Sequence, residues 1–247
     1  MGTRHFIGVK QNGAYKVAQY GQWDGYPEGQ GKTCLNFART IADPENREKF
    51  AAKVRAASFI TPKELEKLWK QYGADEKGYV SCEDADRMKQ DHPEYSRDTG
   101  GKILSVIMER PDGIALQNEI GFAADSLFCE YAWVIDLDAG TFEGFKGFNT
   151  SRELTSEDRF YFLRDKEDDA CDGTRYHGVT LVAKWPLDKL PTDEEMYAAF
   201  AEPEEEDPEL LEDSGEQTVT VSVPNVKRGI GAGQGAVKAI EEGSGGQ

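Results

Sequence analysis

An Asn12-Gly13 pair between two apolar runs is the feature that most restricts how this chain can fold. Asn-Gly readily adopts the positive φ angles of a tight two-residue turn, and such a turn joins two antiparallel strands in a hairpin. Residues 6–11 form the first run. Residues 14–20 return with the period-two alternation of a strand whose two faces have different neighbours. The sequence therefore predicts a β-hairpin at the start of the chain.

The hairpin leads into an unusual loop at residues 21–31, which contains four glycines, one proline, Trp23 and Tyr26. Glycines allow backbone angles that other residues avoid, and the two aromatic side chains offer large apolar faces. Such a loop either folds its rings onto the sheet or forms the wall of a binding site. In the second interpretation, Trp23 and Tyr26 contact the ligand, and Asp24 or Glu28 supplies the polar anchor.

A second hairpin is predicted at residues 129–148, where the turn 138–140 joins two runs of strand-forming residues. A further strand is expected from His177 to Trp185, ended by Pro186. The apolar run at residues 103–108 fits a buried helix or a buried strand, and we favour a helix packed on a sheet. The predicted class is α+β, with an antiparallel sheet built from hairpins.

Helix-start signals are frequent in the remaining sequence. A helix from Lys32 to Ile41 follows the loop, and the pairs Asp43-Pro44 and Thr61-Pro62 open the next two helices. Ser81, followed three residues later by an aspartate, caps another helix. These elements predict a helical insertion at about residues 43–92, and a last helix follows Thr192.

Composition divides the chain into a main domain at residues 1–201, an acidic disordered linker at 202–216, and a strand with a glycine-rich tail at 217–247. The net charge of −17 argues against nucleic-acid binding and against attraction to anionic membranes. No apolar run is long enough to cross a bilayer. Four cysteines without a CxxC pair predict reduced thiols in a cytoplasmic protein.

Two acidic stretches are candidates for ion sites. Residues 73–84 have the outline of an EF-hand loop, but only Asp75, Ser81 and Asp84 offer side-chain oxygens, which favours a helix-loop-helix without an ion. Asp136 and Asp138 lie on the same side of a strand, where they either bind a divalent ion or hold the adjacent turn. We favour the turn, and no metal site is predicted.

Two glycine-rich stretches were weighed as nucleotide sites. Lys32-Thr33 follows glycines as in a phosphate-binding loop, but Tyr26 stands where that motif requires glycine. Residues 231–236 match a dinucleotide-binding fingerprint, yet too little sequence follows for the βαβ unit. The sequence predicts no cofactor.

The opening Gly2-Thr3, the Asn12-Gly13 turn and the return strand that ends at Gln22 resemble N-terminal nucleophile hydrolases of the proteasome type. In that family, cleavage before the threonine frees an amine that serves as base for the threonine hydroxyl. The resemblance implies that Thr3 is the nucleophile and that Lys32, a few positions early, lowers the pKa of its amine. Tyr20 departs from the pattern, because the family has an aspartate there.

The whole chain also resembles a family of uncharacterised proteins found in bacteriophages and fungi, through the segments 1–6, 22–27, 134–138 and 190–192. This resemblance implies no known activity. Two hypotheses follow. The first is a non-catalytic binding or accessory protein, related to phages or mobile elements, that recognises a protein or a small molecule through residues 23–26. The alternative is an amide hydrolase that acts through Thr3.

Overall fold

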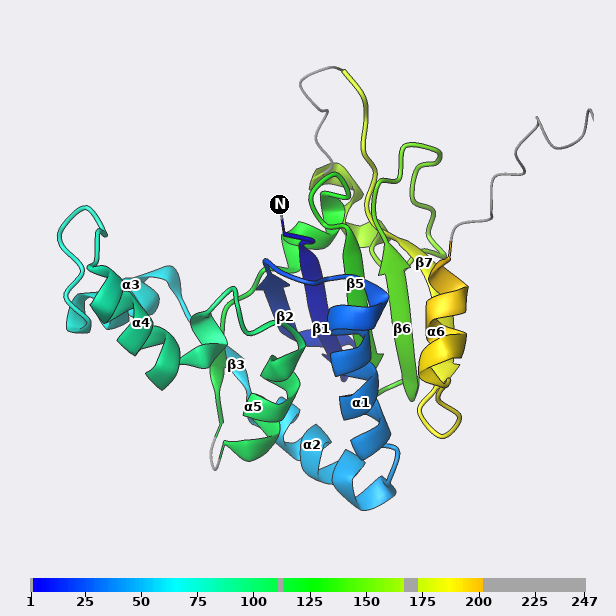
Figure 1. Cartoon of the computed structure of the whole chain (residues 1–247), viewed down its shortest axis with the longest axis horizontal. Coiled ribbons are helices and arrows are strands. Elements are labelled where there is room, and N and C mark those ends of the chain that lie inside the picture. The colour runs from blue at the N-terminus through cyan, green and yellow to red at the C-terminus, as the bar shows by residue number, and fades with distance from the viewer. Residues whose placement is uncertain (1, 111–112, 167–172, 202–247) are drawn as a thin grey trace, which may run out of the picture. The chain divides into compact units, whose positions relative to one another are not determined.

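A five-stranded mixed sheet lies at the centre of this computed structural model (Figure 1). The structure describes residues 2–110, 113–166 and 173–201, so the predicted acidic linker and glycine-rich tail lie outside the described residues. The strand order is β2-β1-β5-β6-β7. The strands are β1 (His5–Gln11), β2 (Ala14–Gly21), β5 (Tyr131–Asp136), β6 (Thr141–Lys146) and β7 (Thr180–Pro186). The described residues also form six α-helices, so the predicted α+β class is confirmed.

Both predicted hairpins are present. Asn12 and Gly13 take positive φ angles of 54° and 75° in the turn between β1 and β2, as their residue types predict. The two hairpins join through β1 and β5, which run parallel with His5 opposite Tyr131. The prediction of a wholly antiparallel sheet is therefore wrong. The alternation of residues predicts that strands form, but it carries no information about which distant strand lies alongside.

The last strand begins later than its sequence pattern predicts, at Thr180 instead of His177. The His177 amide donates to the Asn149 carbonyl (2.9 Å), and the Val179 amide donates to the Ala123 carbonyl (3.1 Å). These residues therefore pair with loops that cover the sheet and not with β6.

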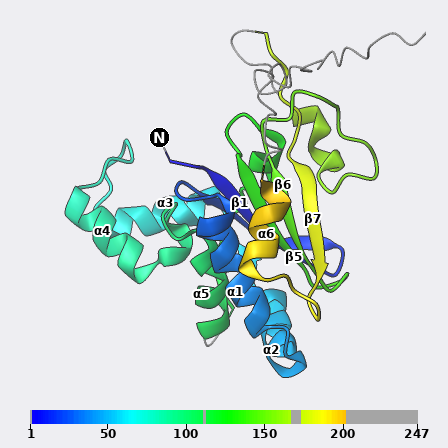
Figure 2. The same cartoon turned by 45° about the vertical axis from the view of Figure 1, so that its right-hand side comes forward.

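Four helices cover one face of the sheet (Figures 1 and 2). They are α1 (Lys32–Thr40), α2 (Pro44–Ala56), α5 (Ile103–Glu109) and α6 (Asp193–Phe200). The main core lies between this layer and the inward-facing side chains of β1, β5 and β6, among them Ile7, Trp133 and Phe142. The helix predicted for the apolar run at 103–108 is confirmed, and the buried residues Ile103 and Leu104 pack in this core.

The opposite face of the sheet carries a second, smaller core. Phe6, Val134 and Phe145 point to this side, because they alternate with the residues of the main core. Short 3-10 helices at Ile120–Ala124 (η4) and Tyr161–Lys166 (η5) lie over them, with Phe160 fully buried. Residues 149–176 are mostly polar in sequence, which gives little sign of a core. Within this segment, however, Phe160 and Leu163 are buried in the second core.

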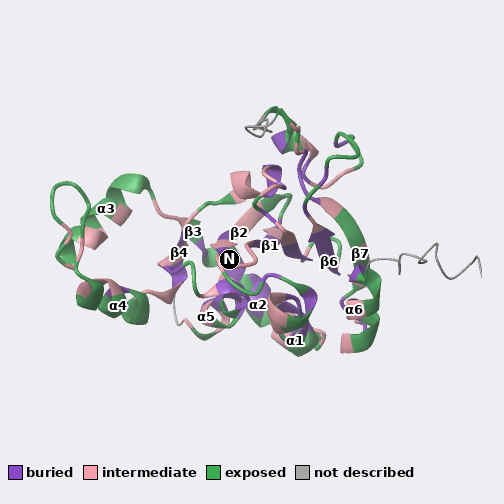
Figure 3. Ribbon diagram, turned by 45° about the horizontal axis from the view of Figure 1, so that its top comes forward, coloured by how far each residue is buried: buried purple, intermediate pink, exposed green. Residues whose placement is uncertain are grey.

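The predicted helical insertion contains two kinds of helix. α2 belongs to the main core, whereas α3 (Pro62–Gln71) and α4 (Cys82–Asp91) stand to one side of the sheet and are largely exposed (Figure 3). α3 has no buried residue, and Met88 is the one buried residue of α4. The predicted caps are confirmed by side-chain hydrogen bonds at the amino ends of these helices, made by Asp43, Thr61 and Ser81. A separate parallel pair joins β3 (Ser58–Phe59) to β4 (Ala115–Leu116).

Candidate functional site

The loop after β2 is held by hydrogen bonds to three distant parts of the chain. The Gln22 amide donates to the Arg97 carbonyl (3.0 Å), and the Gly25 amide donates to the Thr3 carbonyl (2.9 Å). The buried indole of Trp133 donates to the Gly25 carbonyl (2.9 Å). The backbone of the loop is therefore fixed from β5, from the residues before β1 and from the segment before α5. The loop is a preformed surface.

The two aromatic side chains of this loop remain accessible. Trp23 is 46% exposed and Tyr26 is 37% exposed. The Trp23 indole donates to Asp98 (2.9 Å), which fixes the ring in place without burying it. Asp24 has a φ of 58°, in the left-handed region, and its carboxylate accepts a long hydrogen bond from the Tyr26 hydroxyl (3.5 Å). Since each of these two residues is less than half exposed, its side chain both packs within the loop and presents a surface to solvent.

Tyr26 and Glu28 line a depression of about 340 Å³ between the loop and α6. Its aromatic walls also include Tyr131, Tyr197 and Phe200. Tyr131 stacks in parallel on Trp133 (6.5 Å between ring centroids) and lies 6.0 Å from Phe200. The structure thus brings together two of the four predicted binding residues. Trp23 and Asp24 lie in the same loop but do not line this depression.

The two residues assigned to hydrolysis have different surroundings. Thr3 is half-buried just before β1, with its carbonyl bound to Gly25 of the loop. Lys32, at the start of α1, pairs its ammonium with the Asp193 carboxylate of α6 (2.9 Å). This hydrogen bond raises the pKa of Lys32, with a smaller contribution from Tyr197. The positive charge of Lys32 is therefore neutralised by a carboxylate of α6.

His5 is a buried ionisable group beside the same loop. Its side chain is fully buried, and neither ring nitrogen makes a hydrogen bond of good geometry to a described residue, although the Thr3 carbonyl acts on the ring. Burial lowers the pKa of His5 from 6.5 to about 4, opposed more weakly by the Thr3 carbonyl and the Asp24 carboxylate. The imidazole is consequently neutral at physiological pH.

The carboxylates weighed as ion ligands hold turns. Asp75 accepts the amides of Lys77 (2.8 Å) and Tyr79 (2.9 Å) within its own loop. Asp136 accepts amides from the turn that follows it, and Asp138 accepts the Asn12 amide of the neighbouring hairpin (2.7 Å). Among residues 2–110, 113–166 and 173–201, no group of three or more His, Cys, Asp or Glu residues is arranged to hold a metal ion.

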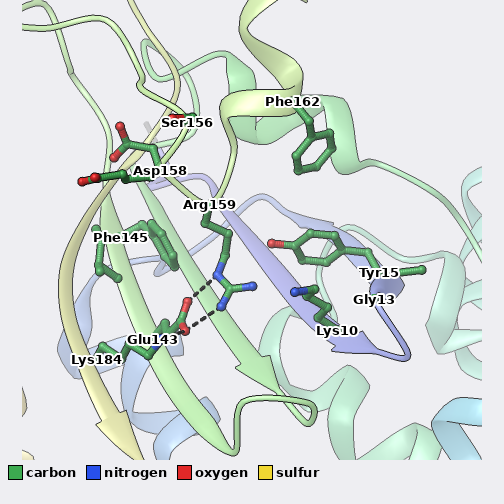
Figure 4. Close-up of a pocket in the computed structure, with 13 residues that line it drawn as sticks. Lys10, Gly13, Tyr15, Glu143, Phe145, Ser156, Asp158, Arg159, Phe162 and Lys184 are labelled. Atoms are coloured by element: carbon green, nitrogen blue, oxygen red, sulfur yellow. Dashed lines mark hydrogen bonds and ion pairs between the residues drawn. The ribbon is translucent and has the colours of Figure 1, made fainter.

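A larger cavity, of about 590 Å³, opens on the sheet face opposite the helices (Figure 4). The residues of its floor come from β1, β2 and β6, and those of its outer wall come from β7 and residues 156–162. Sequence reasoning missed this site. The available signal was Arg159, a cation directly before the apolar run 160–163, but nothing local shows which acids it meets.

An ion network occupies the inner end of the cavity. Arg159 donates two hydrogen bonds to Glu143, drawn as dashed lines in Figure 4, and a third to Asp136 (2.8 Å). Both carboxylates are only 2% exposed. Lys184 also approaches Glu143 (3.2 Å), and Lys10 approaches Asp136 (3.5 Å). The network therefore places three cations around two buried carboxylates.

The protonation states of the network follow from these contacts. Burial acts to raise the pKa of Asp136, but the Ala139 amide and the Arg159 guanidinium outweigh it and hold the pKa below its usual value. For Arg159, burial acts to lower the pKa, and the hydrogen bonds with Glu143 and Asp136 raise it above its usual value. Asp136 and Arg159 are charged in the folded protein.

No protein-family model, curated protein or solved structure matches this chain. The two resemblances read from the sequence therefore stay predictions. In the part of the chain that the structure describes, no helix has both the length and the apolar character to cross a membrane.

Proposed function

We propose that this protein is a non-catalytic binding protein that recognises a basic segment of a protein partner through the loop 22–28. One observation supports this more than any other: the loop backbone is fixed from three sides while Trp23 and Tyr26 stay partly exposed. A fixed backbone lowers the entropy lost on binding, and exposed aromatic residues often dominate binding energy.

The depression beside the loop favours a cationic side chain. Aromatic rings attract cations through their negative faces, and Tyr26, Tyr131 and Tyr197 all line the depression. Glu28 lines it as well, and its carboxylate has no ion pair among the described residues. The nearby ammonium of Lys32 is paired with Asp193 and leaves Glu28 uncompensated. A lysine or arginine side chain satisfies both the rings and this carboxylate.

The charge of the whole protein supports the same partner. A net charge of −17 attracts basic surfaces and accelerates their encounter at low ionic strength. We further propose a cytoplasmic location, because the cysteines Cys34, Cys82 and Cys129 are free thiols. A relation to phages or mobile elements remains part of this proposal on the resemblance of the sequence alone.

The experiment is a binding titration with short labelled peptides that differ only in a central lysine, arginine or glutamate. We expect the basic peptides to bind and the acidic peptide not to bind, with affinity falling as salt rises. Tyr26→Ala and Glu28→Gln should each weaken binding by about tenfold or more, as expected for residues at the centre of an interface.

Tyr79→Ala is the matched control, because Tyr79 is 73% exposed but lies in the loop between α3 and α4. This variant should bind like the wild-type protein. If the three peptides bind equally, or if Tyr26→Ala and Glu28→Gln bind as well as Tyr79→Ala, the proposal is wrong. A protein captured from cells counts as the partner only if the same two variants lose it.

The position of Thr3 supports a second candidate, an amide hydrolase with an N-terminal threonine. Thr3 lies against the loop, next to the buried His5. The intact mass of the purified, untagged protein tests this candidate. Loss of Gly2 from most molecules, prevented by Thr3→Ala, would support self-processing, and a mass that retains Gly2 would exclude it in this form.

A further inference from the structure

The hydrogen-bond acceptors of the 590 Å³ cavity are largely used within the protein. The Asp136 carboxylate accepts the amides of Asp138 (3.0 Å) and Ala139 (2.9 Å) besides its contact with Arg159. The Glu143 carboxylate accepts the Thr141 hydroxyl (2.9 Å) besides two bonds from Arg159. These carboxylates have little capacity left for a donor brought by a ligand.

The unused groups of the cavity are donors. Arg159 makes its bonds through Nε and Nη2, and Nη1 has no hydrogen bond to a described residue. The Tyr15 hydroxyl is buried and points towards the Arg159 guanidinium, which acts on its oxygen, while its proton has no acceptor among the described residues (Figure 4). Burial raises the pKa of Tyr15, so this hydroxyl keeps its proton and is available to donate it. A buried hydroxyl whose proton has no acceptor costs free energy, which a bound acceptor recovers.

The balance of charges at the inner end of the cavity also favours an anionic ligand. Lys10, Arg159 and Lys184 carry three positive charges beside the two negative charges of Asp136 and Glu143. Other acids line the mouth of the cavity. Among them, Asp158 is held by two bonds from Arg152 (2.7 and 2.8 Å), and the exposed Glu157 is screened by solvent. The inner end of the cavity therefore has one positive charge in excess.

The outer wall of the cavity is apolar. Phe162 is 55% exposed and Leu181 is 47% exposed, although both are large hydrophobic residues, and Phe145 lies behind them. Phe162 packs on Tyr15, with ring centroids 6.3 Å apart. A volume of about 590 Å³ lies within the range of small-molecule sites.

We propose that this cavity binds a small amphipathic carboxylate, with its carboxylate between Tyr15 and Arg159 and its apolar body against Phe162 and Leu181. A carboxylate supplies one negative charge and accepts from both unused donors. The site shares no lining residue with the depression beside the loop, so failure of either proposal leaves the other intact.

Calorimetric titration of the full-length protein with octanoate tests the proposal. Octanamide and octylamine are the matched probes, because they keep the chain and replace the anion with a neutral or a cationic group. We expect one molecule of octanoate to bind per chain, and both probes to bind at least about tenfold more weakly, the effect of losing one charge-assisted hydrogen bond. No binding of octanoate at millimolar concentration, or equal binding of the three probes, would overturn the proposal.

Tyr15→Phe separates a ligand site from a structural role. The variant removes only a hydroxyl that is buried with no acceptor for its proton, so the unfolding temperature of the unliganded protein should change little, while its affinity for octanoate falls about tenfold. Tyr79→Phe, far from the cavity in sequence and highly exposed, should change neither quantity.

Leu181→Trp provides a second variant, because Leu181 is half-exposed and a larger side chain there fills the cavity without touching the buried ions. It should abolish octanoate binding while the protein stays folded. Wild-type affinity in both Tyr15→Phe and Leu181→Trp would show that the probe binds elsewhere, and the proposal would be wrong.

Discussion

The two ends of the central strands β1 and β5 bury ionisable groups in opposite ways. At the carboxyl end, Asp136 is charged and is surrounded by Arg159, Lys10 and backbone amides. At the amino end, His5 is equally buried but makes no hydrogen bond of good geometry to a described residue. Around Asp136 the partners outweigh burial and keep the carboxylate charged, whereas around His5 burial outweighs the Thr3 carbonyl and the Asp24 carboxylate and keeps the ring neutral.

The comparison shows that burial alone does not determine how such groups respond to pH. The pKa of Asp136 is held below 3.8, so its contribution to stability is present above that value and is lost as pH falls further. The pKa of His5 is about 4 in the fold against 6.5 unfolded, so its contribution is lost between these two values as pH falls. The two ends of the strands therefore respond in successive pH windows.

The largest expected effect comes from breaking the ion network. Arg159→Met leaves Asp136 and Glu143 buried without their main cation, and we expect a loss of about 3–5 kcal/mol in the free energy of unfolding. Without Arg159, burial raises the pKa of Asp136 with less opposition, so the defect should shrink as pH falls. Chemical denaturation at several pH values measures both effects.

Arg152→Met is the control for this change. Arg152 makes two bonds to Asp158, but its own side chain is 49% exposed and no second carboxylate depends on it, so its loss should cost less than that of Arg159, about 1–2 kcal/mol. Equal losses in the two variants would mean that burial of the network has no special cost.

The second expected effect concerns His5. The shift of its pKa from 6.5 to about 4 corresponds to about 3 kcal/mol of stability, present at neutral pH and lost between pH 6.5 and 4 because the unfolded chain binds the proton first. His5→Asn removes the titrating group, so the stability of this variant should depend less on pH in that window. Parallel curves for the two proteins would assign the pH dependence to other groups.

The smallest expected effect concerns Asp138, just beyond the carboxyl end of β5. The exposed Asp138 accepts the amides of Asn12 (2.7 Å) and Gly13 (2.8 Å), one with each carboxylate oxygen. Asp138→Ala should cost about 1–2 kcal/mol. Asp138→Asn keeps one acceptor oxygen and should lose less. Faster hydrogen exchange at the Gly13 amide in the alanine variant would identify the lost contact, and unchanged exchange would contradict this role for Asp138.

Local signals predict much of the fold. The Asn12-Gly13 turn and the caps Thr61 and Ser81 act within a few residues, and the hairpin and helices that they predict are present. The parallel pairing of β1 with β5 was not predictable in this way, because two strands distant in sequence leave no mark on each other's local pattern. The second core was missed because its apolar residues at 160–163 are surrounded by polar ones.

In the candidate sites, too, the local features were predictable from the sequence and the contacts between distant residues were not. The glycines and aromatic residues of the loop 21–31 predict a surface of special structure, and Tyr26 and Glu28 do line a depression. Its opposite wall, Tyr197 and Phe200 of α6, was not predictable from the loop itself. Arg159 meets Glu143 and Asp136 through the tertiary fold, so only the structure reveals the ion network.

Refolding of this protein should be slowed by the docking of its two hairpins. Each hairpin forms from neighbouring residues, which takes microseconds, whereas β1 meets β5 only when residues 12–130 close into a loop. Such non-local pairing slows folding. Until it occurs, both central strands have free edges, so newly made chains are most exposed to misassociation before this step and not during formation of the hairpins.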